Sequence, residues 1–391
     1  MSQQTFSLVV ILSTLIDFFV IAAVFFRTRW LGERRDSPVI GMGHVLSAVL
    51  ITGLVFVIKL TPLTLLGFNL FGVINLIYID LVILPPATAM TILGASYLPL
   101  REGRRVTVSK SARIFAAGAF ALLPIGLYAS WIEPFRLQLE TAQVPLAPTR
   151  QGKTTIRIGV IADLQTSRIT DYERSAFDRL MALRPDLILM PGDLFQGSEK
   201  DLEANRADLI ALLSQLSAPG GVYFVLGDVD QGHYGLEEIL QAAGIRLLVN
   251  ETTRIKLGDR QVTIGGIELD VSTGQARGTV HQLETDPGVD DVRILVAHRP
   301  DVALGLKRRS RIDLTVAGHT HGGQIVIPGF GPPMTLSDVP RPVAAGGLHS
   351  LLENRLYVSR GVGCERGQAP RIRFFCPPEI SLLQLDNSHP K

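Results

Sequence analysis

Cysteine is scarce in this sequence: Cys364 and Cys376 are the only two among 391 residues, and both lie near the C-terminus. Two cysteines exclude a disulfide-rich scaffold and a zinc finger built on cysteine ligands. They can form one disulfide if this part of the chain is extracytoplasmic, and two free buried thiols are the alternative. A surplus of charge is also absent, with 38 Lys and Arg against 36 Asp and Glu. No basic stripe runs through the soluble half, so no nucleic-acid partner is expected.

Long uncharged runs dominate residues 1–132, whereas residues 133–391 alternate apolar strands with charged helices. The sequence therefore predicts a transmembrane helical region followed by a soluble domain. Four runs are long enough to cross a bilayer, namely residues 6–26, 41–60, 61–100 and 114–131.

Positive charges set the expected orientation, because cytoplasmic loops carry the excess of Lys and Arg. One basic loop follows the first run and another precedes the last. Both loops lie on one side of the membrane only if residues 61–100 cross it once, with the part after Pro86 as a kinked continuation or a partial re-entry. We expect a multi-pass protein of a bacterial-type inner membrane, with four spans and the soluble domain extracytoplasmic. Two crossings within 61–100 are the alternative and would put that domain inside. The basic residues are Arg27, Arg29, Arg34 and Arg35, then Arg101, Arg104, Arg105, Lys110 and Arg113.

Asp17 and Asp80 lie within apolar runs, where ionisable groups are costly and are functional candidates by default. The simpler interpretation is that each pairs with a neighbouring helix or with Lys59 and fixes the packing of the bundle. No regular series of acids indicates an ion path.

Apolar runs in the soluble half end abruptly in residues that can ligate metal. Ligands bind at the carboxyl ends of strands in open α/β sheets, so such ends facing one crevice would make a multi-metal site. Unrelated turns are the alternative, since Asp and Gly are common in turns. Histidine, however, is not a typical turn residue, and imidazole is the commonest transition-metal ligand. The runs end at Asp163, Asp193, Asp228, His298 and the pair His319 and His321.

The order of elements predicts two sheets with helices outside, because strands alternate with helices before a more purely β tail. A helix is expected over 171–183, capped by Thr170 or Asp171 with Glu173 in its first turn. A hairpin is expected about Gly258-Asp259. A short helix over 302–307 and a short strand over 325–327 follow.

These segments resemble, in order and spacing, the motifs of the calcineurin-like metallophosphoesterases, in the branch with an N-terminal membrane anchor. The resemblance covers residues 133–385. It implies an α/β fold, a four-layer α/β/β/α sandwich preceded here by an all-α transmembrane region of about four helices. The matching segments are Asp163-Leu164-Gln165, Gly192-Asp193, Gly227-Asp228-Val229-Asp230, His298, Gly318-His319-Thr320-His321, Gly322-Gly323-Gln324, Ser359-Arg360-Gly361-Val362-Gly363 and Pro377-Pro378-Glu379-Ile380.

The resemblance also implies two metal ions that share Asp193 and activate a hydroxide for attack on phosphorus. Imidazole with carboxylate oxygens suits Mn, Fe or Zn better than copper or calcium. Two such ions about 3.5–4 Å apart can clamp the attacking and leaving oxygens. The implied ligands are Asp163, Gln165, Asp193 and His321 for one ion, and Asp193, Asp228, His298 and His319 for the other.

Three positions depart from the family pattern. Gln165 replaces a ligand histidine, and Asp228 replaces an asparagine while keeping a ligand oxygen. Val229 replaces the histidine that would protonate the leaving group or stabilise the transition state, and valine can do neither, a loss of roughly 10²–10⁴ in rate. His233 is the candidate substitute, although it can equally be a surface or packing residue. Asp230, whose motif position orients the missing histidine, is expected to be a turn residue or a partner of His233.

The sequence thus predicts a membrane-anchored, metal-dependent phosphoester hydrolase acting near the bilayer on a phosphorylated small molecule or lipid. Without the acid, it should favour leaving groups that need little protonation, such as pyrophosphate bonds or a lipid-linked nucleotide. The alternative is a catalytically impaired pseudoenzyme that binds metal or a phosphorylated ligand without turnover. A transporter with an accessory domain has less support, since no inverted repeat is found.

Overall fold

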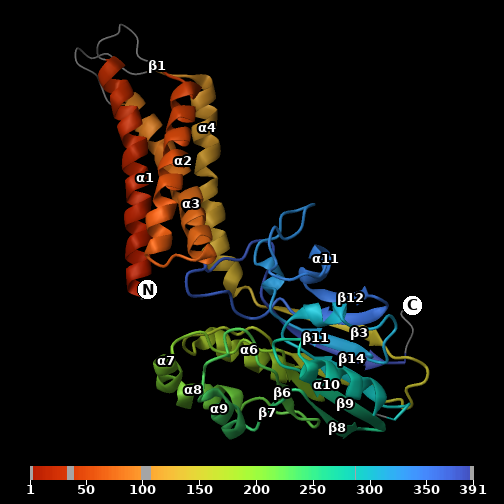
Figure 1. The fold of residues 1–391 in the computed structure, drawn as a ribbon. Coiled ribbons are helices and arrows are strands. Elements are labelled where there is room, and N and C mark those ends of the chain that lie inside the picture. Colours follow the sequence, from red (N-terminus) through yellow and green to blue (C-terminus); the bar gives the residue numbers. More distant parts are fainter. Residues whose placement is uncertain (1–2, 33–38, 98–106, 287, 388–391) are drawn as a thin grey trace. The chain divides into compact units, whose positions relative to one another are not determined.

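The computed structural model describes residues 3–32, 39–97, 107–286 and 288–387, which form two compact units (Figure 1). The first comprises Met1–Ser130 with Arg366–Pro370 and is called the helical unit here. The second comprises Trp131–Glu365 with Arg371–Lys391 and is called the sheet unit.

Four helices of the helical unit are long and apolar enough to cross a membrane, which confirms the predicted number. The second helix continues to Leu65 and ends before Gly67, whose φ is +94°, so residues 61–65 belong to it and not to the third. The third helix runs through Pro85 and Pro86, which membrane helices tolerate because their surroundings satisfy the freed backbone groups. The helices are α1 (Gln3–Gly32), α2 (Met42–Leu65), α3 (Leu70–Tyr97) and α4 (Lys110–Phe120), and the last span continues through α5 (Leu122–Leu127) and a π-helical turn (Tyr128–Ile132).

Two short strands join the connections between these helices. β1 (Val39–Ile40) pairs in parallel with β2 (Thr107–Val108), so the α1–α2 and α3–α4 connections meet at one end of the helical unit. A single crossing by the third helix requires this arrangement. Arg34, Arg35, Arg101, Arg104 and Arg105 lie outside the described residues, and the side of the membrane stays a prediction.

The two acids of the apolar runs hold helices together. Asp17 of α1 is fully buried and forms an ion pair with Lys59 of α2, which also donates to Ser13 Oγ at 2.8 Å. Asp80 of α3 accepts a hydrogen bond from Thr14 of α1 at 2.9 Å. These contacts confirm that Asp17 pairs with Lys59 and that Asp80 pairs with a neighbouring helix; a role in fixing the packing of the bundle stays an interpretation.

Two six-stranded sheets form the centre of the sheet unit. Strands β4 to β7 are parallel in the first sheet, and β9, β10, β11 and β13 are parallel in the second. The order in the first sheet is β3 (Gln138–Pro145), β14 (Glu379–Asp386), β4 (Ile156–Val160), β5 (Leu187–Met190), β6 (Val222–Phe224) and β7 (Arg246–Leu247). The order in the second is β12 (Gly347–Leu351), β13 (Asn354–Val358), β11 (Leu314–Ala317), β10 (Val292–Val296), β9 (Arg260–Gly266) and β8 (Glu251–Leu257).

Successive side chains of a strand point to opposite faces of its sheet. In both sheets, each of the two faces is apolar. In β5, Leu187 and Leu189 join the core between the sheets, whereas Ile188 and Met190 pack under the helices of the first sheet. On the second sheet, Leu283 of α10 packs in the outer core. The layers are therefore α/β/β/α, as predicted (Figure 1). The helices are α6 (Asp171–Ala182), α7 (Glu199–Ala204), α8 (Arg206–Leu213), α9 (Leu236–Ala242), α10 (Gly274–Thr285) and α11 (Arg341–Ala344).

Several local predictions can be compared with the structure. Thr170 caps α6 in a capping box with Glu173, and β8 and β9 form the expected hairpin, so both are confirmed. The helix expected over 302–307 is a 3-10 segment, Pro300–Leu304, which ends at Gly305. Residues 325–327 form only isolated bridges, since Gly323 and Gly329 at positive φ bend the chain on either side. The two cysteines are free and buried.

Candidate metal centre

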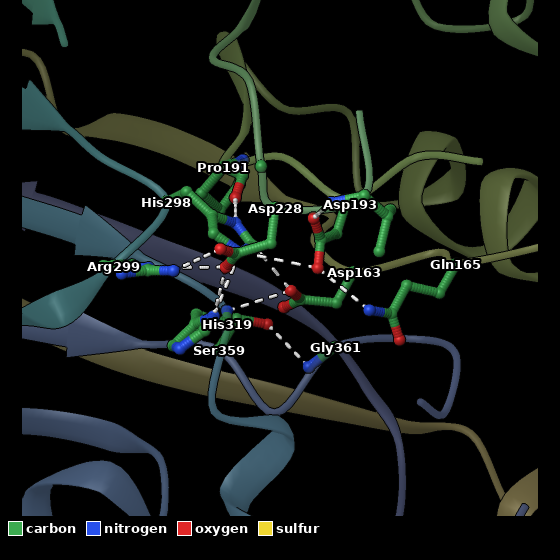
Figure 2. Close-up of polar contacts among 12 residues, drawn as sticks. Asp163, Gln165, Pro191, Asp193, Asp228, His298, Arg299, His319, Ser359 and Gly361 are labelled. Carbon is green, nitrogen blue, oxygen red and sulfur yellow. Dashed lines mark hydrogen bonds and ion pairs between the residues drawn. The ribbon is translucent and has the colours of Figure 1, made fainter. Parts of the chain in front are cut away.

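Five parallel strands end close together, and each end is followed by a candidate ligand (Figure 2). Potential ligand atoms lie within 4.8 Å of one another in two groups. His298 belongs to both groups, whereas Asp193 is the residue that the resemblance makes common to both ions. The groups are Asp163 with Asp193 and His298, and Asp228 with His298 and His319.

Backbone carbonyls orient the two imidazoles of the second group. Asp228 Oδ2 lies 2.8 Å from His319 Nδ1 and 3.2 Å from His298 Nε2. The opposite nitrogens lie near carbonyls: His298 Nδ1 is 2.7 Å from Pro191 O, and His319 Nε2 is 3.1 Å from Leu336 O. Each imidazole can thus donate one N–H to a backbone carbonyl, and loss of the proton that faces Asp228 would leave that nitrogen as a metal ligand, the arrangement of metal-ligating histidines.

The electrostatics of this group depend on its close carboxylates. Burial lowers the pKa of His298, but Asp193, Asp228 and Asp163 outweigh it and raise that pKa to about 10. Burial acts to raise the pKa of Asp228, yet hydrogen bonds from His298, His319 and Arg299 hold it well below its usual range. Arg299, which follows His298 directly, was not singled out from the sequence.

The first group is more deeply buried. Asp163 Oδ1 accepts a hydrogen bond from His319 N at 2.9 Å, while Asp163 Oδ2 is buried without a hydrogen-bond partner among the described residues. Asp193 accepts from Val229 N and from Gln165 Nε2, both at 2.9 Å. Burial raises the pKa of Asp163 to about 7, with His298 opposing the rise and Asp193 adding to it. A cation would offset this cost of two adjacent buried carboxylates.

His321 flanks this group without belonging to either set of close ligand atoms, and Gln165 lies beside Asp193. His321 is buried, and its Nε2 has no hydrogen-bond partner among the described residues. Burial and Arg373 lower the pKa of His321 well below its usual value, so the ring is neutral, as a ligand must be. Gln165 turns its amide nitrogen toward Asp193, and toward Glu365 at 3.3 Å. Nothing in the sequence singled out Glu365.

The backbone at these ligands is strained. Left-handed φ is uncommon outside glycine and costs of order 1–3 kcal/mol per residue, so it persists only where the surroundings enforce it. Five of the seven candidate ligands adopt it. Their φ values are +48° at Asp163, +38° at Gln165, +59° at Asp193, +74° at His319 and +48° at His321.

Asp230 holds two of the ligand loops together, a role that the sequence did not predict. Its buried carboxylate accepts hydrogen bonds from the N–H groups of Asp193 (2.7 Å), Leu194 (2.9 Å) and Gly227 (2.8 Å). Burial and the charge of Asp193 raise its pKa to about 6, while the N–H groups oppose the rise. Asp230 lies in a turn, one of the two expected roles, and its contact with His233 is a backbone hydrogen bond from His233 N to Asp230 O at 3.3 Å.

His233, the candidate substitute acid, lies against another element. Its Nδ1 is 3.1 Å from Glu199 Oε2, and its ring meets Phe195 edge-on with centroids 5.8 Å apart. Within the described chain, no hydrogen bond or ring contact links it to the candidate ligands. Its role as an acid stays a prediction.

The donor set fits divalent or trivalent transition metals. Two buried atoms without partners, Asp163 Oδ2 and His321 Nε2, accompany two imidazoles whose tautomers are fixed from behind. Imidazole with carboxylate is the chemistry that Mn, Fe and Zn prefer.

Comparison with known proteins agrees with this site. The family model for calcineurin-like phosphoesterases matches residues 156–323, a range that contains all seven candidate ligands. The phosphodiesterase YaeI of Escherichia coli is 30% identical over 293 residues, covering 72% of this chain and 98% of that protein. The uncharacterized metallophosphoesterase YkuE of Bacillus subtilis is 27% identical over 294 residues, covering 71% and 99%. With its ligand order, its two-sheet fold and these relatives, the chain belongs to the calcineurin-like phosphoesterase family.

Proposed function

We propose that this chain is a membrane-anchored, metal-dependent phosphoester hydrolase. The observation that carries the proposal is the convergence of Asp163, Asp193, Asp228, His298 and His319 at one group of strand ends. Buried carboxylates left beside partnerless nitrogen and oxygen atoms are costly without a cation, so a binding role explains the arrangement better than a purely structural one.

Under this proposal every protein ligand of the two ions is a side chain of this chain. Asp163, Gln165, Asp193 and His321 would hold one ion, and Asp193, Asp228, His298 and His319 the other. Ions bound there supply Lewis-acid chemistry, activating water and neutralising charge on the phosphoryl group. The carbonyls of Pro191 and Leu336 orient the two imidazoles, and Asp230 keeps the Asp193 and Gly227 loops in register.

The bond that is cleaved is proposed to have a good leaving group. Val229 occupies the motif position of the acid and cannot donate a proton. A phosphate or nucleotide leaves without protonation, whereas an alkoxide does not. The name of the relative YaeI, a phosphodiesterase, is compatible with a disubstituted pyrophosphate as substrate.

The location is proposed from the helical unit. Its four membrane-length helices favour a substrate at the bilayer, such as a lipid-linked phosphate. The connections that carry the basic residues meet at one end, so we assign that end to the cytoplasm and the sheet unit to the other side.

The test is hydrolysis of a disubstituted pyrophosphate and of an alkyl phosphodiester by the purified full-length protein with Mn(II), followed through the phosphate monoesters that both reactions release. We expect the pyrophosphate to react at least about a hundredfold faster, the scale of a missing acid. His319→Ala should lose metal by elemental analysis and lose turnover. His281→Ala, at an exposed histidine of α10, is the matched control and should keep both.

Two outcomes would contradict the proposal in different ways. A clear preference for the alkyl diester would refute the leaving-group argument. Metal binding without turnover, with activity appearing only after Val229→His, would identify a pseudoenzyme.

A further inference from the structure

Arg299 lies at the end of β10, directly after the candidate ligand His298, and its guanidinium pairs with Asp228 (Figure 2). Its Nη2 donates to Asp228 Oδ1, and its Nε donates to Asp228 Oδ2 at 3.4 Å. Asp228 stands where the family pattern has an uncharged asparagine. The extra negative charge at this position therefore comes with a positive one.

This guanidinium is close to the expected reaction centre. The carboxylate that it holds also contacts His319 and His298, at 2.8 and 3.2 Å. Asp228 is followed directly by Val229, the position at which the family places its acid. Arg299 and Val229 thus flank the same ligand.

Arg299 also has N–H groups that are available to a ligand. Its side chain is 42% exposed, and Nη1 forms no hydrogen bond with any other residue of the described chain. The residue lies on the wall of a cavity of about 480 Å³ that Gln231, Asp301 and Ser337 also line. Asp301 accepts hydrogen bonds from the Ser337 hydroxyl at 3.0 Å and from the Asp338 N–H at 2.6 Å. With Asp270 and Asp338 it also lines the cavity, and its charge acts on the guanidinium without a direct hydrogen bond to it among the described residues.

We propose that Arg299 binds the phosphoryl oxygens of the substrate and supplies the positive charge of the imidazole that Val229 replaces. The inference rests on the proposed function and deepens it. A guanidinium presents planar, paired donors that match phosphate oxygens, and it stays protonated in proteins. It therefore stabilises charge but cannot protonate a leaving group. The site would therefore stabilise the charge of the phosphoryl group through Arg299. It would still require a leaving group that departs as an anion, because the guanidinium does not protonate it.

The test is binding of inorganic pyrophosphate to the Mn(II)-loaded full-length protein, measured by calorimetry. Arg299→Gln should weaken binding roughly ten- to a hundredfold, the scale of hydrogen bonds to a charged group. Arg299→Lys should recover part of the loss. Arg308→Gln is the matched control, because that arginine is 76% exposed and pairs with Glu353, and it should bind as the wild type does.

Metal content separates this role from simple charge balance at Asp228. We expect Arg299→Gln to retain its Mn(II) at saturating metal while binding pyrophosphate weakly. Val229→His should restore pyrophosphate binding in the Arg299→Gln background. Loss of metal in Arg299→Gln, with metal and pyrophosphate binding both regained in Asp228→Asn/Arg299→Gln, would overturn the proposal. So would a wild-type protein that binds Mn(II) but no pyrophosphate.

Failure of the hydrolase assignment gives a different result. A wild-type protein that turns over neither the substituted pyrophosphate nor the alkyl phosphodiester can still bind pyrophosphate through Arg299, because the calorimetric comparison does not depend on turnover.

Discussion

At the scale of single residues, two glycines determine how closely the ligand loops approach each other. A Cβ on Gly227 would lie 2.2 Å from Asp193 Oδ1 and 2.4 Å from Asp193 N. A Cβ on Gly318 would lie 2.5 Å from Asp163 Oδ2. Neither position can accept a side chain without moving a candidate ligand, and at Gly227 the obstacle includes backbone, which cannot rotate away.

Gly227→Ala should therefore push the Asp193 loop away and weaken metal binding. We expect a cost of about 1–3 kcal/mol in stability, typical of overpacking, together with a loss of bound Mn(II). Gly278→Ala is the control, because that glycine lies in α10 with nothing within 4 Å of a Cβ, and alanine is the better helix former. Elemental analysis of both variants checks the difference. Equal metal content in the two would contradict the close approach of the loops.

The candidate ligands could be predicted from sequence because each follows a run with the pattern of a buried strand. The strand ends and the His319-Thr320-His321 spacing were sufficient to name six, whereas Gln165 was named only from the resemblance to the family motif. Asp230 could not be interpreted this way, since two of its three N–H partners, Asp193 and Leu194, lie in a distant segment of the chain. The positive φ values at Asp163, Asp193 and His319 are equally invisible, because the chain around them enforces a conformation that local preference disfavours.

At the scale of elements, one buried ion pair ties the segment before β4 to β10 and β11. Arg150 Nε donates to both oxygens of Asp313, at 2.8 and 3.0 Å, and Asp313 also accepts from Arg293 N at 2.8 Å. The guanidinium donates further to the carbonyls of Val289 and Arg311. Burial raises the pKa of Asp313 although Arg150 opposes the rise.

Arg150→Met should cost about 3–5 kcal/mol near neutral pH, because it leaves Asp313 buried without its partner. The folded pKa of Asp313 lies above the unfolded value of about 3.9, so its contribution to stability falls as the pH rises through the folded value. Removal of Arg150 raises the folded pKa further. The deficit of the variant should therefore be larger at about pH 7.5 than at about pH 5, where Asp313 can take up a proton.

The melting temperature of the sheet unit measures this deficit, followed with a dye that reacts with Cys364 and Cys376 once they are exposed. Both thiols are buried in the folded protein. Arg308→Met, at an exposed pair with Glu353, is the control and should cost less than about 1 kcal/mol at either pH. A deficit that does not change with pH would show that Asp313 stays charged without Arg150.

Elements with strong local signals were predicted, and those set by tertiary contacts were not. The capping box of Thr170 and Glu173 and the Gly258-Asp259 hairpin are encoded within a few residues. Strand β12 was missed because its apolar residues Leu348 and Leu351 do not alternate, and it forms by pairing with β13.

At the scale of the whole molecule, the proposed side of the membrane rests on the order of helices in the helical unit. Parallel pairing of β1 with β2 joins the two connections next to the basic residues at one end of that unit. If each of the four apolar helices crosses the membrane once, the chain returns to the side on which it began. If the basic end is cytoplasmic, the sheet unit is extracytoplasmic, where a lipid-linked substrate would be met at the outer face.

Labelling of Tyr234→Cys in intact cells tests this orientation. Tyr234 is 91% exposed in the sheet unit, so a cysteine there should react with a membrane-impermeant maleimide wherever the reagent can reach that unit. We expect labelling in spheroplasts without permeabilisation, and little labelling of the wild type, whose two cysteines are buried. Reaction only after permeabilisation would put the sheet unit in the cytoplasm. The distribution of Arg and Lys would then be a poor guide for this protein, and the proposed substrate would have to be sought at the inner face of the bilayer.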